Sequence, residues 1–363
     1  MIILVYAIAA FFVLRFLVAL VNLVFSPVLK KQETPLRPLI SVLIPARNEE
    51  TNIATLLNDL KNQSYKNIEV IVFNDQSTDR TAEITSDFCT IDKRYRLVHS
   101  DELPEGWLGK NNACHQLAKK ASGEYLLFLD ADVRIQSGLI ESLTAQMHRH
   151  NLRLISVFPK QIMKTMGEKI TVPVMNSILL SLLPMILTRE SPRPSLAAAN
   201  GQLMFFEKNT YLQVWPHEQV KNQMVEDILI ARLYKKKGFA MQCMTGNETI
   251  SCRMYHSLFD SILGFSRNVA EYFGGNHLAA LFYWFLGTFG IVFIALFLPF
   301  VYFIASLFIV IITKIMVSIV SRQSVWENLL FALPQQLLLG IIVIYSYRNK
   351  IQKKAQWKGR NIG

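Results

Sequence analysis

The chain has 363 residues, of which 51 % are apolar and 18 % are charged. This composition is too apolar for an ordinary soluble enzyme, so we expect membrane segments. The formal net charge of +11 suits a membrane surface or an anionic substrate. Nucleic acid is a poor alternative, because no basic stripe interleaved with aromatic residues occurs. The four cysteines form no C-x-x-C pair and show no zinc spacing, so we expect free thiols.

Residues 2–24 are almost continuously apolar. At 1.5 Å per residue, a helix of this length would be about 35 Å long, enough to cross a hydrocarbon core of roughly 30 Å. A signal peptide is the alternative, but the run is long and lacks a basic start, so we expect an uncleaved anchor over residues 1–27. Three basic residues follow it: Lys30, Lys31 and Arg37. By the positive-inside rule, we then expect a plasma-membrane protein whose next domain lies in the cytoplasm.

Three apolar runs, at residues 39–44, 68–73 and 126–129, each end in a polar loop. Helical spacing follows the first run over residues 52–62, and a helical stretch follows the second from Thr81. Strands alternating with helices predict an open α/β sheet, whose ligands bind at the strand C-termini. We therefore expect a functional site where these polar loops meet.

Asp130 and Asp132 stand at the end of the third run. In an extended segment, residues i and i+2 lie on the same face. Two carboxylates so placed can hold one Mg²⁺ or Mn²⁺ ion, which takes oxygen ligands and often adds phosphate oxygens. An Asp-rich turn is the alternative. Asp75 follows the second run, where its carboxylate could accept hydrogen bonds from a base or ribose, whereas Asp79 is better explained as a helix N-terminal residue or turn former.

Longer motifs surround these residues. They are SVLIPARNE at 41–49, NDQSTD at 74–79, DAD at 130–132 and EDIL at 226–229. In order and spacing they resemble family 2 glycosyltransferases, over roughly residues 39–270. Three loop motifs narrow the resemblance: LPEGWLGKNNA at 103–113, RMY at 253–255 and GFSRN at 264–268. They are similar to a membrane-bound subgroup that glycosylates carotenoid acids, including diaponeurosporenoate glucosyltransferases, and to its hopanoid-associated relatives.

The resemblance implies a GT-A nucleotide-diphospho-sugar transferase fold, a Rossmann-like mixed α/β sheet flanked by N-terminal and C-terminal transmembrane helices. It implies inverting, metal-dependent transfer of one hexose, expected from UDP-glucose, to a membrane lipid such as a carotenoid or other terpenoid acid or alcohol. Asp132 would hold the Mg²⁺ or Mn²⁺, and Asp130 would bind the metal or the donor ribose. The donor-binding residues would be Pro45, Ala46, Arg47, Glu49, Asp75, Lys110, Asp130 and Arg253. A solvated loop lysine is the alternative for Lys110.

The expected catalytic residues are Asp227, as the general base, and Glu226 as the second choice. Carboxylates in a first helical turn are also common because they complement the helix dipole. Processive family members carry Gln-x-x-Arg-Trp where residues 251–255 read SCRMY. This difference argues against a polysaccharide synthase and leaves Arg253 as a diphosphate contact. A membrane protein that only binds nucleotide is the other alternative, and the full set of acidic motifs speaks against it.

Beyond a catalytic domain at 38–275, a membrane region is expected at 276–348 and a basic cytoplasmic tail at 349–363. Residues 278–312 contain no charge and could form two helices broken near Pro299, while 329–345 is a further apolar run. Two crossings would keep the tail inside and three would not, so the number stays open. Two other apolar stretches, 170–187 and 258–273, suit interfacial helices or ordinary core packing.

Overall fold

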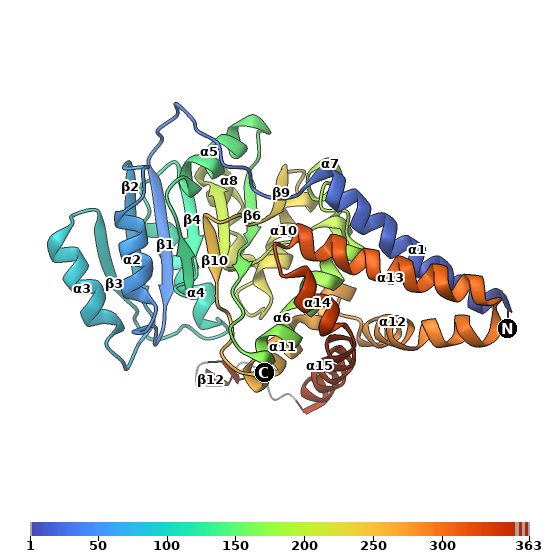
Figure 1. Ribbon diagram of the computed structural model, residues 1–363. Helices are drawn as coiled ribbons and strands as arrows, with labels where there is room; N and C mark the ends of the chain where they lie inside the picture. Colours follow the sequence, from blue (N-terminus) through green and yellow to red (C-terminus); the bar gives the residue numbers. More distant parts are fainter. Residues whose placement is uncertain (1, 353–355, 358–359, 362–363) are drawn as a thin grey trace.

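The computed structural model describes residues 2–352, 356–357 and 360–361. A seven-stranded sheet in the order β3-β2-β1-β4-β8-β6-β9 forms its centre (Figure 1). The strands are β1 Ile40–Ala46, β2 Ile68–Asn74, β3 Tyr95–His99, β4 Tyr125–Leu129, β6 Leu154–Phe158, β8 Leu203–Glu207 and β9 Met241–Thr245. The first four run parallel, β8 runs antiparallel to β4 and β6, and β9 is parallel to β6. The predicted mixed α/β sheet is confirmed.

The parallel strands bring their C-terminal loops to one edge, because β1 and β2 pair in register from Ile40 with Ile68 to Ala46 with Asn74. Strand β1 is longer than its apolar run, since it includes Pro45. Proline cannot donate a ladder hydrogen bond, so it is poorly tolerated inside a sheet. Here β4 pairs with β1 only as far as Leu43, so Pro45 lies beyond that ladder.

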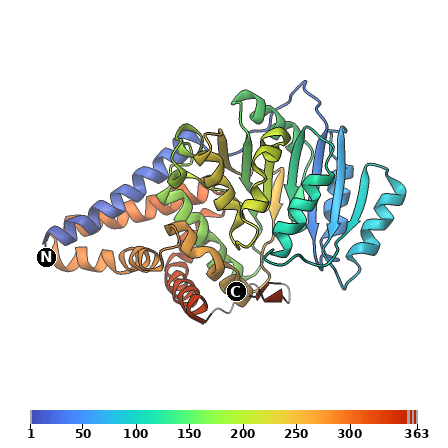
Figure 2. The same cartoon turned by 180° about the vertical axis from the view of Figure 1, so that it is seen from behind.

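Helices cover both faces of the sheet (Figures 1 and 2). One face packs against α2 Ile53–Lys61, α3 Thr81–Ile91 and α5 Leu139–Arg149. The other packs against α4 Gly109–Lys120, α8 Lys208–Val214 and α10 Glu226–Lys236, and against the ends of two long apolar helices. A small sheet joins β5 Val133–Ile135, β10 Ile250–Cys252 and β7 Lys160–Gln161. The short helices are α7 Leu187–Glu190, η1 Pro194–Leu196 and α9 Pro216–Gln219.

Three of the described helices are long and apolar enough to cross a membrane: α1 Ile2–Phe25, α12 His277–Phe297 and α13 Phe300–Val320. They lie side by side and project from the sheet domain, with the N-terminus at their far end (Figures 1 and 2). The expected break at Pro299 is confirmed, because that residue caps α13. The apolar run at 329–345 lies mostly in α15 Ala332–Gln352, which is not one of the three. The structure thus offers two candidate crossings after the sheet domain.

Two helices connect the sheet domain to the apolar helices: α6 Met166–Leu182 and α11 Leu258–Asn268, the latter followed by η2 Val269–Phe273. Side chains from both helices form one buried cluster with residues of α12 and α15. Core packing therefore explains the apolar character of most of the 170–187 stretch. Helix α6 continues through this stretch although Pro173 lies inside it. Helix α11 is only partly buried: Ser261, Gly264 and Phe265 are buried, whereas Leu258 and Phe259 at its start are exposed.

The chain after α1 is fastened to the sheet edge. Val28 forms a parallel bridge with Thr245 of β9, and the Leu29 amide donates to the Thr245 carbonyl at 2.8 Å. The side-chain amide of Asn247 donates to the Leu29 carbonyl at 2.8 Å. At the other end, α14 Val325–Leu330 precedes α15, and β11 Gln356–Trp357 pairs with β12 Arg360–Asn361. Three lysines of the expected basic tail, Lys353, Lys354 and Lys358, lie outside the described residues.

Candidate active site

A cavity of about 160 Å³ lies at the C-terminal ends of β1, β2 and β4. Its lining residues are Pro45, Ala46, Arg47, Glu49, Asp75, Gly109, Lys110, Ala113, Asp130, Ala131 and Asp132. Seven of the eight residues expected to bind the donor line it, and Arg253 does not. Asp75 is buried beneath it, and the Arg47 guanidinium donates to the Asp75 carbonyl oxygen at 2.7 Å.

The loops after β1 and β2 hold each other in place around this cavity. The Asn48 amide donates to Ser77 Oγ at 3.0 Å, and the Thr78 amide donates to Asn48 Oδ1 at 2.8 Å. Asp79 accepts hydrogen bonds from the Glu50 and Thr81 amides, both at 3.0 Å. Asp79 is therefore a structural residue at the start of α3, in agreement with its sequence interpretation.

A second cavity, of about 310 Å³, adjoins the first. It is lined by Leu103, Trp107, Leu108, Gly109, Lys110, Asn111, Asp130, Asp132, Asn200, Gly201, Gln202, Gln223, Met224, Val225, Glu226, Asp227, Met254, Tyr255, Gly264, Arg267 and Asn268. Gly109, Lys110, Asp130 and Asp132 line both cavities, so these residues stand at their junction. A molecule in one cavity can thus meet a molecule in the other at this point.

Lys110 joins the two acidic motifs. Its ammonium nitrogen lies 2.9 Å from Asp130 Oδ1 at the end of β4 and 3.1 Å from Glu226 Oε1 at the start of α10. Burial opposes the charged amine, but the carboxylates of Asp130 and Glu226 hold the pKa of Lys110 well above its ordinary value. Lys110 is thus a fixed cation at the junction of the cavities, and the solvated-loop interpretation is wrong.

Asp227 is held by the backbone. Its Oδ2 accepts from the Gly201 amide at 2.9 Å, and its Oδ1 accepts from the Ile228 amide at 2.8 Å. Burial and the neighbouring charge of Glu226 raise the pKa of Asp227 to about 7. A side chain added at Gly201 would come within 3.0 Å of both Lys110 Nζ and Glu226 Oε1, which explains glycine at this position. Asp227 therefore lines the second cavity as a carboxyl group that can change its protonation near neutral pH.

Asp132 has the features of a cation ligand. Its Oδ1 is buried and has no hydrogen-bond partner among the described residues. Burial and the nearby carboxylates of Asp130 and Glu49 raise the pKa of Asp132 to about 7. A bound cation would relieve both conditions, because it would pair the free oxygen and neutralise the repulsion. Within the described part of the chain, no cluster of three or more His, Cys, Asp or Glu side chains forms a complete metal site. Phosphate oxygens or water would have to complete the coordination.

Arg253 is placed differently from the sequence expectation, and a second arginine, Arg267, lies at the site without having been predicted there. The Arg253 guanidinium pairs with the buried Glu168 of α6, with its Nη2 2.7 Å from Oε1, and lines neither cavity. Arg267 of α11 lines the second cavity instead. The GFSRN motif contains Arg267, but its spacing alone did not indicate a role. His256 is exposed and also lines neither cavity.

Comparisons with known proteins agree with this geometry. Residues 41–190 match the sequence profile of "Glycosyl transferase family 2". A 4,4'-diaponeurosporenoate glycosyltransferase of Staphylococcus haemolyticus is 28 % identical over 251 residues, which are 66 % of this chain and 64 % of that relative. A 4,4'-diaponeurosporenoate glycosyltransferase of Staphylococcus aureus (strain USA300) is 26 % identical over 256 residues, which are 69 % of this chain and 66 % of that relative. The chain thus spans just under two thirds of these relatives' length.

A solved mannosyltransferase from Pyrobaculum calidifontis, in complex with GDP-Man and Mn²⁺, superposes with a TM-score of 0.60 at 15 % identity. The superposition covers 97 % of this chain and 100 % of the mannosyltransferase chain, so the shared GT-A fold includes the flanking helices. The profile match and the strand-end motifs identify residues 41–190 as a glycosyl transferase family 2 domain.

Proposed function

We propose that this protein transfers a single hexose from a nucleotide sugar, with UDP-glucose as the expected donor, to a membrane lipid such as a carotenoid or other terpenoid acid or alcohol. The observation that carries the proposal is the meeting of two cavities at Lys110, Asp130 and Asp132, with Asp227 lining the second. The carotenoid-acid name of the relatives supports the acceptor class. The apolar helices that flank the sheet domain support a membrane acceptor.

In this proposal the cavity between β1, β2 and β4 takes the nucleotide. Asp75 and the loop around Arg47 bind the base and ribose, and Lys110 lies beside the diphosphate. Asp132, together with Asp130, would hold Mg²⁺ or Mn²⁺, whose charge stabilises the leaving diphosphate. Because the buried Oδ1 of Asp132 has no hydrogen-bond partner in the described part of the chain, that atom is the expected ligand. Arg253 remains a predicted diphosphate contact only if it leaves Glu168.

The second cavity takes the acceptor. An acceptor oxygen attacks the anomeric carbon as the bond from that carbon to the diphosphate oxygen breaks, and this single displacement inverts the configuration. A hydroxyl acceptor loses its proton to Asp227, whose pKa of about 7 suits a base at neutral pH. Glu226 is less suited to act as the base, because its carboxylate already forms an ion pair with Lys110. A carboxylic acid acceptor is ionised before it binds and needs no base, but it needs a cation, and Arg267 supplies one in this cavity.

The same proposal assigns an anchor to residues 1–27, a cytoplasmic catalytic domain to 38–275, a membrane region to 276–348 and a basic tail to 349–363. Helices α1, α12 and α13 would make three crossings of the plasma membrane. Two crossings after the domain return the chain to the domain's own side, which agrees with the positive-inside rule for the tail. A cysteine placed before α1 and labelled only by an impermeant reagent added outside cells would support this orientation.

The test uses detergent-solubilised protein, UDP-glucose, Mn²⁺ and terpenoid acceptors that end in either a carboxyl group or a hydroxyl group. We expect products with one sugar of inverted configuration, read by NMR. Asp227→Asn should abolish transfer to the hydroxyl acceptor, while Asp87→Asn, an exposed aspartate on α3, should not. Chain-like products, or transfer only to water-soluble sugars, would contradict the proposal.

A further inference from the structure

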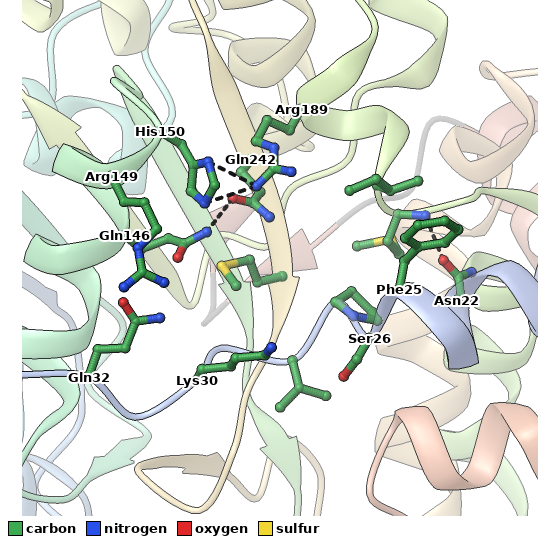
Figure 3. A pocket seen from close by; sticks show the side chains of 15 residues that line it. Asn22, Phe25, Ser26, Lys30, Gln32, Gln146, Arg149, His150, Arg189 and Gln242 are labelled. Carbon is green, nitrogen blue, oxygen red and sulfur yellow. Dashed lines mark hydrogen bonds between the residues drawn. The ribbon is translucent and has the colours of Figure 1, made fainter.

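A third cavity, of about 150 Å³, lies away from the active site, where the end of α1 meets the sheet domain (Figure 3). The segment that follows α1, the C-terminal end of α5, helix α7 and strand β9 all contribute to it. Four of its fifteen lining residues carry basic side chains: Lys30, Arg149, His150 and Arg189. None of the fifteen is an aspartate or glutamate. The lining therefore favours an anion.

The basic side chains are only partly neutralised by the protein. Arg189 donates to the ring of His150 and pairs with Glu190, whose Oε1 lies 2.6 Å from Arg189 Nη2 and which does not line the cavity. Lys30 and Arg149 are exposed, and no side-chain hydrogen bond or ion pair holds either of them among the described residues. Burial, Arg189 and Arg149 together lower the pKa of His150, as expected where positive charges gather.

The cavity is amphipathic. Figure 3 shows Arg149, His150 and Arg189 on one side of it and Phe25 and Asn22 of α1 on the other. Met185 and Ile186 add to the apolar wall. The neighbouring Val24 and Phe25 expose more than 60 % of their surface along the last turn of α1. A ligand with a charged head and an apolar tail could therefore bind with its head against α5 and its tail along α1.

The position in the chain indicates where this ligand comes from. Helix α1 is one of the three helices that could cross a membrane, and its last turn forms one wall of the cavity. In a bilayer, the end of a spanning helix lies at the level of the lipid phosphates. Basic pockets beside membrane helices bind anionic headgroups at this level. We propose that this cavity binds the phosphate of an anionic phospholipid, with Lys30 and Arg149 as the principal contacts. The proposal does not depend on the activity proposed above.

The test measures thermal unfolding of the full chain in a neutral detergent, titrated with short-chain phosphatidylglycerol. We expect the lipid to raise the unfolding temperature, and the apparent affinity to fall about thirtyfold when Lys30→Gln and Arg149→Gln remove two cations. The matched control replaces two exposed lysines at the far edge of the sheet domain, Lys66→Gln and Lys93→Gln, and should leave the affinity unchanged.

Three further results would overturn the proposal. An equal rise in unfolding temperature with phosphatidylcholine of the same chain length would mean that only the acyl tails bind. If inorganic phosphate raised the unfolding temperature equally, and this effect were lost in the same double variant, the ligand would be a soluble phosphate and not a lipid. An equal loss in the control variant would mean that only total charge matters.

A second measurement does not depend on variants that fold. A photoactivatable phosphatidylglycerol analogue should label wild-type peptides that contain residues 22–32 or 146–150. Labels found only along α12 and α13 would overturn the proposal.

Discussion

Removing the cation at the junction of the two cavities should cost stability as well as activity. Lys110→Met keeps the side-chain length but leaves Asp130 and Glu226, at 2.9 and 3.1 Å from the ammonium, without their partner. Breaking a buried ion pair from one side typically costs about 3–5 kcal/mol. The side chain of Lys110 retains 26 % of its exposure, so we expect solvent screening to reduce the loss to about 2–3 kcal/mol.

A double-mutant cycle with Glu226→Gln tests this reasoning without knowledge of the acceptor. Neutralising Glu226 removes the charge that Lys110→Met leaves unpaired, so the double variant should be more stable than the sum of the single changes predicts. We expect a coupling of about 1–2 kcal/mol.

Thermal unfolding in detergent is the assay, and roughly 2 °C per kcal/mol applies to a chain of this size, so Lys110→Met should lower the midpoint by about 5 °C. Lys93→Met, at an exposed site, should change it little. Strict additivity of the two changes would refute the coupling of Lys110 with Glu226.

Three other outcomes follow from the site. Transfer to a hydroxyl acceptor should increase with pH through about 7, because Asp227 must be ionised to accept a proton, and Asp227→Asn should lower kcat by about 10²–10⁴ with little change in UDP-glucose affinity. Asp132→Asn should weaken UDP binding in Mn²⁺ but not in EDTA, measured by calorimetry; equal affinity in Mn²⁺ would remove Asp132 from the metal. Gly264→Ala would place a methyl group 2.1 Å from the Tyr255 hydroxyl, so it should impair acceptor turnover but not UDP binding.

The sequence was most informative where function depends on strand ends. Pro45, Asp75 and Asp130 follow apolar runs, and the parallel register of β1 and β2 brings these ends together. Such a site can be predicted because alternating strands and helices specify the sheet edge. The role of Lys110 was harder to predict from local pattern, because its two partners, Asp130 and Glu226, lie 20 and 116 residues later in the chain. Its charge is held in place by the end of β4 and the start of α10 together.

Other parts of the site depend on contacts that no local pattern encodes. Arg253 was expected at the diphosphate, but Glu168 of α6 lies 85 residues earlier in the chain and reaches it because α6 packs between the sheet domain and the apolar helices. Arg267, and not Arg253, is the arginine that lines the second cavity, because α11 presents Arg267 to the cavity and not Phe265. The sequence left open whether the apolar run at 329–345 forms a third crossing. In the structure, Gln335 and Gln336 of α15 donate hydrogen bonds to the Lys169 carbonyl and the Thr288 hydroxyl, which ties that helix to its neighbours.

The pairing of residues 27–29 with β9 has a consequence for acceptor choice. Two backbone hydrogen bonds join Pro27 and Leu29 to Thr245, and Asn247 adds a third contact to Leu29, so the anchor continues directly into the sheet without a flexible linker. If α1 crosses the bilayer as proposed, this attachment restricts how far the sheet domain can rise or tilt. In the proposed function, the distance from the bilayer surface to Asp227 would then be a fixed length, which would have to match how far a lipid's polar end extends from the membrane. Acceptors would be sorted by the reach of that end, and the tail would be free to vary.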